Sequence, residues 1–139
     1  MKHPQSIAVL VAAAFLPTAA IAETVDITVE NIEVQSGTLH IGLYDAETYD
    51  GGNAVNGAQV TVVGNTISVT LQDITPGEYG VKIFHDEDND GEMDTNPFGL
   101  PTEAYAFSNN AKGRFGPAKW EDAKFVVSEA GTAQIISLN

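Results

Sequence analysis

Carboxylate side chains are concentrated in one short segment of the chain, residues 86–94 (DEDNDGEMD). Asp86, Asp88 and Asp90 occupy alternate positions, and Gly91 follows them directly. A hard cation such as Ca²⁺ takes roughly six to eight oxygen ligands, and alternate side chains on a curled loop can converge on one ion. Glycine permits the sharp turn that such a loop needs, because it adopts positive φ without steric cost. The segment therefore predicts a Ca²⁺-binding loop.

The loop begins with the ligand spacing of an EF-hand but does not end with it. Counted from Asp86, the EF-hand position that uses a backbone carbonyl is Glu92, the next ligand is Asp94, and the last is Pro97. Proline has no carboxylate, and the flanking sequence is strand-like, so an EF-hand helix pair is excluded. The predicted metal ligands are Asp86, Asp88, Asp90, Glu92 and Asp94.

Another residue must complete such a site, and Glu103 and Asp122 are the two carboxylates that we consider for this role. The alternative is an acidic turn without metal, in which Asp and Asn side chains accept hydrogen bonds only from nearby backbone N–H groups.

The two histidines of the predicted domain give weaker signals. His85 shares the alternation of Val81 and Ile83, so we expect it to point into the core and to orient the loop through a hydrogen bond. His40 alternates with Leu39 and Ile41, so we expect it at the surface. Two histidines far apart in the sequence are poor evidence for a transition metal.

Residues 95–120 combine aromatic side chains with amides, which can form a sugar- or peptide-binding face. The same aromatic side chains can instead form a small satellite core that holds a long loop against the domain. Lys112 and Arg114 lie in this segment, and we expect them to pair with the acidic residues. The predicted partner surface comprises Phe98, Tyr105, Phe107, Asn109, Asn110, Phe115 and Trp120.

The first residues have the pattern of a secretory signal peptide. Lys2 gives a basic start, residues 7–16 are apolar, and Ala20-Ile21-Ala22 is a small-x-small cleavage site. The apolar run is too short for a permanent membrane span. We therefore expect residues 1–22 to be removed after Ala22 and residues 23–139 to act in the periplasm or outside the cell.

Composition limits the possible partners. The chain has 19 Asp and Glu against 6 Lys and Arg, which gives a net charge of −13, and such a surface repels nucleic acid and anionic lipid. It has no Cys, so no disulfide can stabilise the exported domain. About 117 residues remain after cleavage, enough for one domain with its own core.

Alternation with period two indicates the strands that must position these groups. It runs through residues 25–29, 39–43 and 79–83 and shifts near Ile32, which suggests a bulge or a strand end. Residues 58–72 read as a hairpin around Gly64-Asn65, and two more strands are expected near 123–127 and 132–138. The predicted fold is all-β, a single seven-stranded antiparallel sandwich of the immunoglobulin type, with one long loop over 86–119.

The order of short motifs in this chain is similar to that of the DUF2141 family of exported bacterial proteins. The motifs are PGEY at 76–79, FHDEDNDG at 84–91, MD at 93–94, GLPTE at 99–103, YAFSNNA at 105–111, GRFGP at 113–117 and EDA at 121–123. Trp120 stands where the family pattern leads us to expect Phe. The resemblance implies a periplasmic or secreted single domain with a transthyretin-like sandwich, and it supplies no catalytic residue.

These observations favour an exported, non-enzymatic module. Its Ca²⁺-binding loop would order the neighbouring aromatic and Asn-rich surface for a protein or glycan partner. One alternative is a metal-independent structural or envelope-interaction domain. An enzyme is the least favoured class, because the chain has no Cys nucleophile, no Gly-x-Ser-x-Gly motif and no His pair at metalloprotease spacing.

Overall fold

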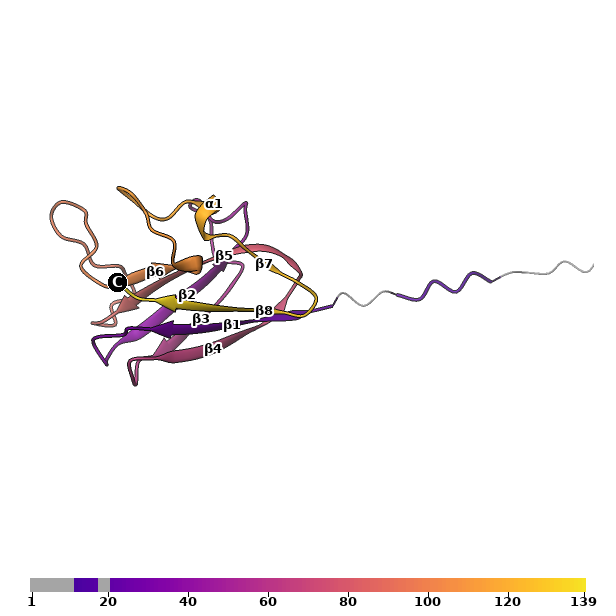
Figure 1. Ribbon diagram of the computed structural model, residues 1–139, viewed down its shortest axis with the longest axis horizontal. Coiled ribbons are helices and arrows are strands. Elements are labelled where there is room, and N and C mark those ends of the chain that lie inside the picture. The colour runs from indigo at the N-terminus through magenta and orange to yellow at the C-terminus, as the bar shows by residue number, and fades with distance from the viewer. Residues whose placement is uncertain (1–11, 18–20) are drawn as a thin grey trace, which may run out of the picture.

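The structure, a computed structural model, describes residues 12–17 and 21–139 (Figure 1). Residues 12–17 and 21–22 form no helix or strand. Most of the predicted signal peptide, residues 1–11 and 18–20, lies outside the described residues. Among the described residues, no helix has the length and apolar character needed to cross a bilayer.

The described chain is almost entirely β-structure, as predicted. Eight strands are present: β1 (Glu23–Glu30), β2 (Thr38–Tyr44), β3 (Asn56–Thr61), β4 (Ile67–Ile74), β5 (Gly77–Asp86), β6 (Tyr105–Phe107), β7 (Phe125–Val127) and β8 (Thr132–Ser137). Helical structure in residues 12–17 and 21–139 is limited to a 3₁₀ turn, η1 (Ser108–Asn110), and a single turn of α-helix, α1 (Trp120–Ala123).

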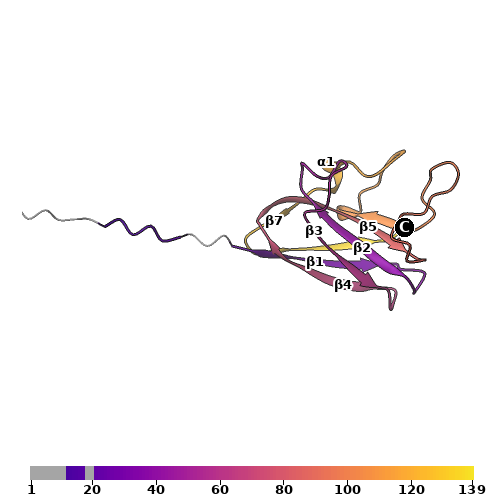
Figure 2. The same ribbon diagram turned by 180° about the vertical axis from the view of Figure 1, so that it is seen from behind.

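The strands form two sheets that face each other (Figures 1 and 2). The smaller sheet has the order β4-β1-β8, and the larger has the order β3-β2-β5-β6, with β7 also paired to β5. The predicted count of seven strands is wrong, because β6 has only three residues and is too short to show alternation. The predicted antiparallel arrangement is also incomplete, because β1 and β8 are parallel.

The hairpin predicted over residues 58–72 is not formed. β3 pairs with β2 and β4 pairs with β1, so the connection through Gly64-Asn65 crosses from the larger sheet to the smaller one. Ile32 N–H donates to the Asn65 carbonyl at 3.1 Å and holds this connection against the segment after β1. Alternation shows which face of a strand is buried, but it is the same whether the next strand joins the same sheet or the opposite one.

The inward faces of both sheets share one apolar core. Val25, Ile27 and Val29 of β1 are fully buried, and Leu39 and Leu43 of β2 face them from the other sheet. The alternation of these residues in the sequence is thus confirmed as an inward-facing pattern. The expected shift near Ile32 is a strand end, since β1 stops at Glu30 and the following Asn31 has positive φ.

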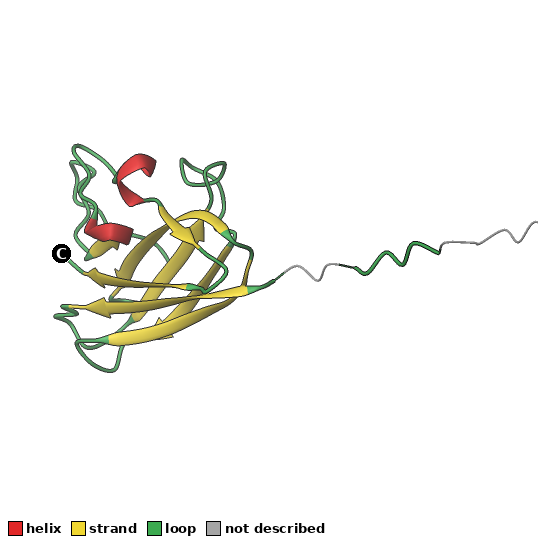
Figure 3. Ribbon diagram, turned by 45° about the vertical axis from the view of Figure 1, so that its right-hand side comes forward, coloured by secondary structure: helices red, strands yellow, loops and turns green. Residues whose placement is uncertain are grey.

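The segment 86–119, predicted as one long loop, is interrupted by β6 and η1. The parts without regular structure lie with residues 45–55 on the side of the larger sheet that faces away from β1 and β4 (Figures 1 and 3). A satellite core of Tyr49, Phe107, Ala118 and Ala123, with Trp120 packed against it, supports them. Tyr49 Oη donates to the Ala118 carbonyl at 2.9 Å. The predicted satellite core is therefore confirmed for Phe107 and Trp120, whereas Phe98, Tyr105 and Phe115 are exposed and do not belong to it.

Candidate functional site

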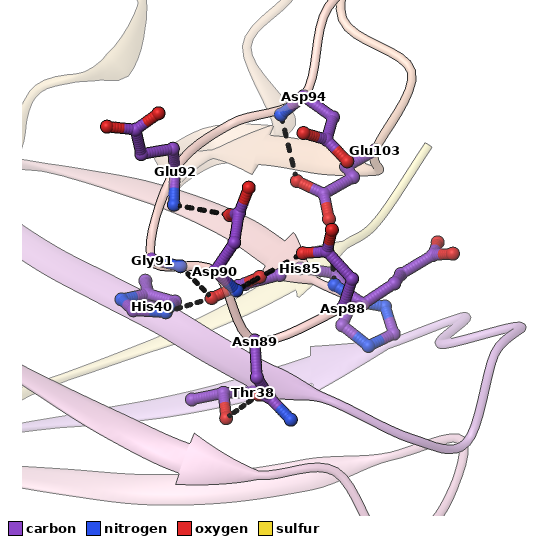
Figure 4. Close-up of polar contacts among 12 residues, drawn as sticks. Thr38, His40, His85, Asp88, Asn89, Asp90, Gly91, Glu92, Asp94 and Glu103 are labelled. Carbon is purple, nitrogen blue, oxygen red and sulfur yellow. Dashed lines mark hydrogen bonds and ion pairs between the residues drawn. The ribbon is translucent and has the colours of Figure 1, made fainter.

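The last residue of β5, Asp86, anchors the acidic loop. Its side chain is 2 % exposed. Oδ2 accepts hydrogen bonds from Gly91 N–H at 2.9 Å and His40 Nε2 at 3.1 Å, and Oδ1 accepts one from Asp90 N–H at 3.2 Å (Figure 4). Burial favours the neutral carboxyl, but the hydrogen bonds from Gly91 N–H, His40 and Asp90 N–H favour the carboxylate, and the pKa of Asp86 lies below its ordinary value.

The loop after Asp86 curls as the sequence predicts. Gly91 has a φ of 84°, the left-handed conformation that glycine adopts most readily. Asn89 also has positive φ, and its Oδ1 accepts a hydrogen bond from Thr38 Oγ1 at 2.7 Å, which ties the loop to β2. Asp88 Oδ1 accepts from Asp90 N–H, and Asp90 Oδ1 accepts from Glu92 N–H, so these carboxylates also stabilise the turn.

Glu103, just before β6, joins the two ends of this loop. Its side chain is buried, and Oε1 accepts a hydrogen bond from Glu87 N–H at 2.8 Å. Oε2 accepts one from Asp94 N–H at 3.0 Å (Figure 4). A single carboxylate that follows the acidic segment in the chain therefore fixes both the start and the end of that segment.

Carboxylate oxygens converge in two groups that share Asp88. One group is Asp86, Asp88 and Glu103, the other is Asp88, Asp90 and Asp94, and within each group the ligand atoms lie within 4.8 Å of one another. All these donors are carboxylate oxygens, the ligand type that hard cations prefer. A carboxylate has about four lone-pair sites, so the hydrogen bonds already made leave room for coordination. The residues thus fit a hard divalent cation, with water or carbonyl oxygens completing its shell.

Of the two residues considered for completing the site, the structure brings Glu103 to it. Asp122 belongs to neither group and lies in α1. The Glu92 carboxylate is outside both groups, and its backbone N–H donates to Asp90 Oδ1 at 2.8 Å. The carbonyl ligand that the EF-hand spacing assigns to Glu92 stays a prediction.

Mutual repulsion shows in the pKa values of this cluster. Burial, followed by the negative charges of Asp88, Glu103, Asp90 and Asp86, raises the pKa of Asp94. For Asp88, the hydrogen bond from Asp90 N–H lowers the pKa, but burial and the neighbouring carboxylates outweigh it and leave the pKa raised. A bound cation would favour the ionised form of both residues.

The predicted orientation of His85 is confirmed, and the prediction for His40 is wrong. His85 is buried, and its Nε2 bonds the Ser36 carbonyl at 2.6 Å, so the predicted inward orientation is confirmed. His40 was expected at the surface, but it stacks on Phe84 with ring centroids 4.5 Å apart and bonds Asp86. Its side chain is only 19 % exposed. Alternation places His40 outward, but it does not show that β2 lies beside β5, where Phe84 is the direct partner of His40.

A groove of about 1120 Å³ lies on the outward face of the larger sheet, next to the acidic loop. Four residues of the predicted partner surface line it, namely Phe98, Tyr105, Phe107 and Phe115. Trp120 does not, because it packs edge-on against Tyr49 at 5.4 Å in the satellite core.

The two asparagines predicted for the partner surface do not line the groove either. Asn109 Nδ2 donates to the carbonyls of Asp122 and Lys124, and Asn110 Oδ1 accepts from Ser137 N–H. The structure therefore separates the predicted surface into an apolar groove and a set of amides that hold η1 against α1 and β8.

The expected pairing of Lys112 and Arg114 with the acidic residues is not formed. Both side chains are exposed, and within residues 12–17 and 21–139 the ion pairs involve only His40 with Asp86 and Lys124 with Glu78 and Glu121. The aqueous surroundings of exposed charges weaken such pairs, so proximity in the sequence is a poor guide to them.

Comparisons with known proteins identify one family. No curated protein and no solved structure matches the chain. Residues 27–135, which include all of β2 to β7 and the whole acidic loop, match the model of a bacterial family. The chain therefore belongs to DUF2141, the family described as an uncharacterized protein conserved in bacteria.

Proposed function

We propose that the protein is an exported, non-enzymatic binding module whose acidic loop is stabilised by Ca²⁺ and presents the adjacent groove to a ligand. The observation that supports the cation most directly is the convergence of Asp86, Asp88, Asp90, Asp94 and Glu103 in two groups that share Asp88. Burial, followed by the like charges of its neighbours, raises the pKa of Asp94, and at Asp88 the same two effects outweigh the hydrogen bond from Asp90 N–H. A divalent cation at this position would remove the repulsion between these charges.

Export is supported by the sequence of residues 1–22 and by the position of the first strand. Cleavage after Ala22 would leave Glu23, the first residue of β1, at the new N-terminus, so every strand of the domain would be retained. We place the mature domain in the periplasm or outside the cell. The shared core between two sheets supports a sandwich of the transthyretin or immunoglobulin type.

A second candidate is a metal-independent structural or envelope-interaction domain, and one observation favours it. The two buried carboxylates of the loop already have partners, since Asp86 accepts hydrogen bonds from Gly91, Asp90 and His40, and Glu103 accepts two from the backbone. A loop held in this way can be ordered without an ion.

Calorimetric titration of Ca²⁺ into chelator-treated protein, with parallel thermal melts, separates the two candidates. A ligand at a hundredfold excess over its Kd stabilises the folded state by about 2.7 kcal/mol, which raises Tm by roughly 10 °C for a domain of this size. The double variant Asp88→Asn/Asp90→Asn should lose this response. Glu33→Gln/Glu129→Gln, which removes the same charge from exposed sites, should keep it. If the wild-type protein gives neither heat nor a change in Tm, the metal-independent domain is the correct candidate.

A further inference from the structure

The groove on the larger sheet differs in charge from the rest of the molecule. Its floor is the outward face of β2, β3, β5 and β6, and its walls are the segments 98–101 and 113–117. The chain has 19 Asp and Glu, but none of them lines this groove. Among the described residues, Lys82 is the one Lys or Arg that lines the groove. A groove without carboxylates that contains a single lysine is complementary to one negative charge.

Lys82 is held in place but has no anionic partner. Its ammonium lies 4.8 Å from the ring centroid of Tyr44 and 4.3 Å from that of Tyr49, and it donates a hydrogen bond to the Tyr49 carbonyl. No described carboxylate forms an ion pair with it. Burial lowers the pKa of Lys82, an effect that the charge of Asp50 only partly offsets. An ammonium has three donors, so Lys82 can still bind an anion in the groove.

The walls of the groove are apolar and unusually exposed. Phe98 is 90 % exposed, Leu100 is 61 % exposed, and Phe115 is fully exposed. Phe115 also has a φ of 58°, a conformation that is unfavourable for a bulky side chain. Neighbouring exposed apolar side chains beside a groove are typical of a binding site. A ligand that lies between these walls would cover all three side chains.

A sugar is a poorer match to this groove than an apolar molecule. The amides of Asn109 and Asn110, which a sugar-binding face would use, are bonded to the backbone outside the groove. Asn56 and Gln59 are the amides that remain among the lining residues, and Asn56 Nδ2 already donates to the Gln72 carbonyl. Specific sugar recognition needs several precisely placed hydrogen-bonding groups, which the apolar walls do not provide.

We propose that this groove binds a small, elongated apolar carboxylate, with its carboxylate paired to Lys82 and its hydrocarbon part between Phe98, Leu100 and Phe115. The groove is at least as large as the roughly 300–1000 Å³ of ordinary small-molecule sites. This proposal specifies the ligand class of the binding module proposed above and rests on that function, but it does not require the cation.

The test compares three small amphiphiles that share a ten-carbon alkyl chain and differ in their head group, each at a concentration below its aggregation threshold. Isothermal titration of the purified protein with decanoate, decan-1-ol and decyltrimethylammonium should give the tightest binding for decanoate. Lys82→Met keeps the aliphatic stem and removes the charge, so it should weaken decanoate binding by about tenfold or more and leave decanol binding unchanged. Lys82→Arg should keep the preference for decanoate.

Two control sets separate the charge of Lys82 from its surroundings. Lys124→Met, which removes a lysine outside the groove that pairs with Glu78 and Glu121, should leave all three affinities unchanged. Phe98→Ser/Phe115→Ser should weaken decanoate and decanol together. The proposal is overturned if decanoate binds no more tightly than decanol, or if folded Lys82→Met binds decanoate as well as the wild-type protein does. If Lys82→Met does not fold, the order of the three probes on the wild-type protein decides.

Titrations in chelator and in Ca²⁺ distinguish failure of this proposal from failure of the cation site. Decanoate binding without any effect of Ca²⁺ on Tm would support the groove and reject the cation. A rise in Tm with Ca²⁺ but no decanoate binding in either condition would reject the groove ligand alone.

Discussion

Glu103→Gln is the most informative single change in the acidic loop. The wild-type carboxylate accepts hydrogen bonds from Glu87 N–H and Asp94 N–H, one on each oxygen. A glutamine has one acceptor oxygen, so one backbone N–H would face an NH₂ group and lose its partner. Losing a charge-assisted hydrogen bond costs about 1.5–3 kcal/mol, and relief of repulsion with Asp88 and Asp94 offsets part of this cost. We therefore expect a net loss of roughly 2 kcal/mol of folding stability in chelator.

Thermal melts in chelator measure this loss as a decrease in Tm of about 8 °C, at roughly 4 °C per kcal/mol for a domain of this length. Glu129→Gln, an exposed change of the same chemistry, is the matched control and should leave Tm unchanged. A Glu103→Gln protein that melts like the wild type would refute the reasoning, because the two backbone contacts would then not hold the loop. Repeating the melts in Ca²⁺ shows which group binds the ion. A retained Ca²⁺ response assigns it to Asp88, Asp90 and Asp94, without Glu103.

Two further predictions concern pH and a buried hydroxyl. In chelator, Tm should rise as the pH falls from neutral through the raised pKa values of Asp88 and Asp94, because the folded state binds these protons more readily than the unfolded chain does. Below the ordinary aspartate pKa of about 3.9, Tm should fall, since Asp86 has a lowered pKa and its contribution is lost as it becomes protonated. Melts between neutral pH and strong acid would contradict this if Tm falls throughout or if saturating Ca²⁺ leaves the rise unchanged. Ser108→Ala should cost roughly 2–4 kcal/mol in denaturant unfolding, because buried Ser108 Oγ accepts from Val81 N–H at 2.8 Å and donates to the Ala123 carbonyl at 2.5 Å. Exposed Ser128→Ala is its control, and a loss below about 1 kcal/mol would show that other groups satisfy these atoms.

The alternation of apolar and polar residues correctly predicted the structural features that depend on a single strand. The burial of Val25, Ile27 and Val29 and the inward orientation of His85 follow from period two, because successive side chains of a strand point to opposite faces. The curl at Gly91 was equally local, since it needs only a residue that tolerates positive φ. These features could be predicted because they do not depend on which segment lies alongside.

Features that depend on strand partners could not be predicted in this way. The sequence around Gly64-Asn65 is compatible with a hairpin, but β3 and β4 pair with β2 and β1 in opposite sheets. β1 and β8 run parallel: Val25 lies beside Thr132 at the start of the two strands, and Glu30 lies beside Ser137 at their end. The alternation within β1 or β8 does not show which strand will pair with it. The position of Glu103 beside Asp86 and Asp88 also depends on a long-range contact, the pairing of β6 with β5.

His40 shows most clearly how the acidic loop and the groove are connected. The His40 imidazole makes two contacts: its Nε2 is hydrogen-bonded to Asp86 Oδ2, and its ring stacks on Phe84. Both His40 and Phe84 line the groove. A single side chain is therefore in contact with the carboxylate that anchors the loop and with the surface proposed to bind the ligand.

The backbone makes a second connection between the two. The Asp94 carbonyl accepts a hydrogen bond from Thr102 N–H at 2.9 Å, and Thr95 and Pro101 form a bridge immediately beyond it. These contacts form the base of the short segment that carries Phe98 and Leu100 along the groove. A cation that removes the repulsion at Asp94 would stabilise the same backbone that positions this wall, so decanoate should bind more tightly in Ca²⁺ than in chelator. Equal affinities in the two conditions would mean that the loop and the groove work independently, despite sharing His40 and the base of the 95–101 segment.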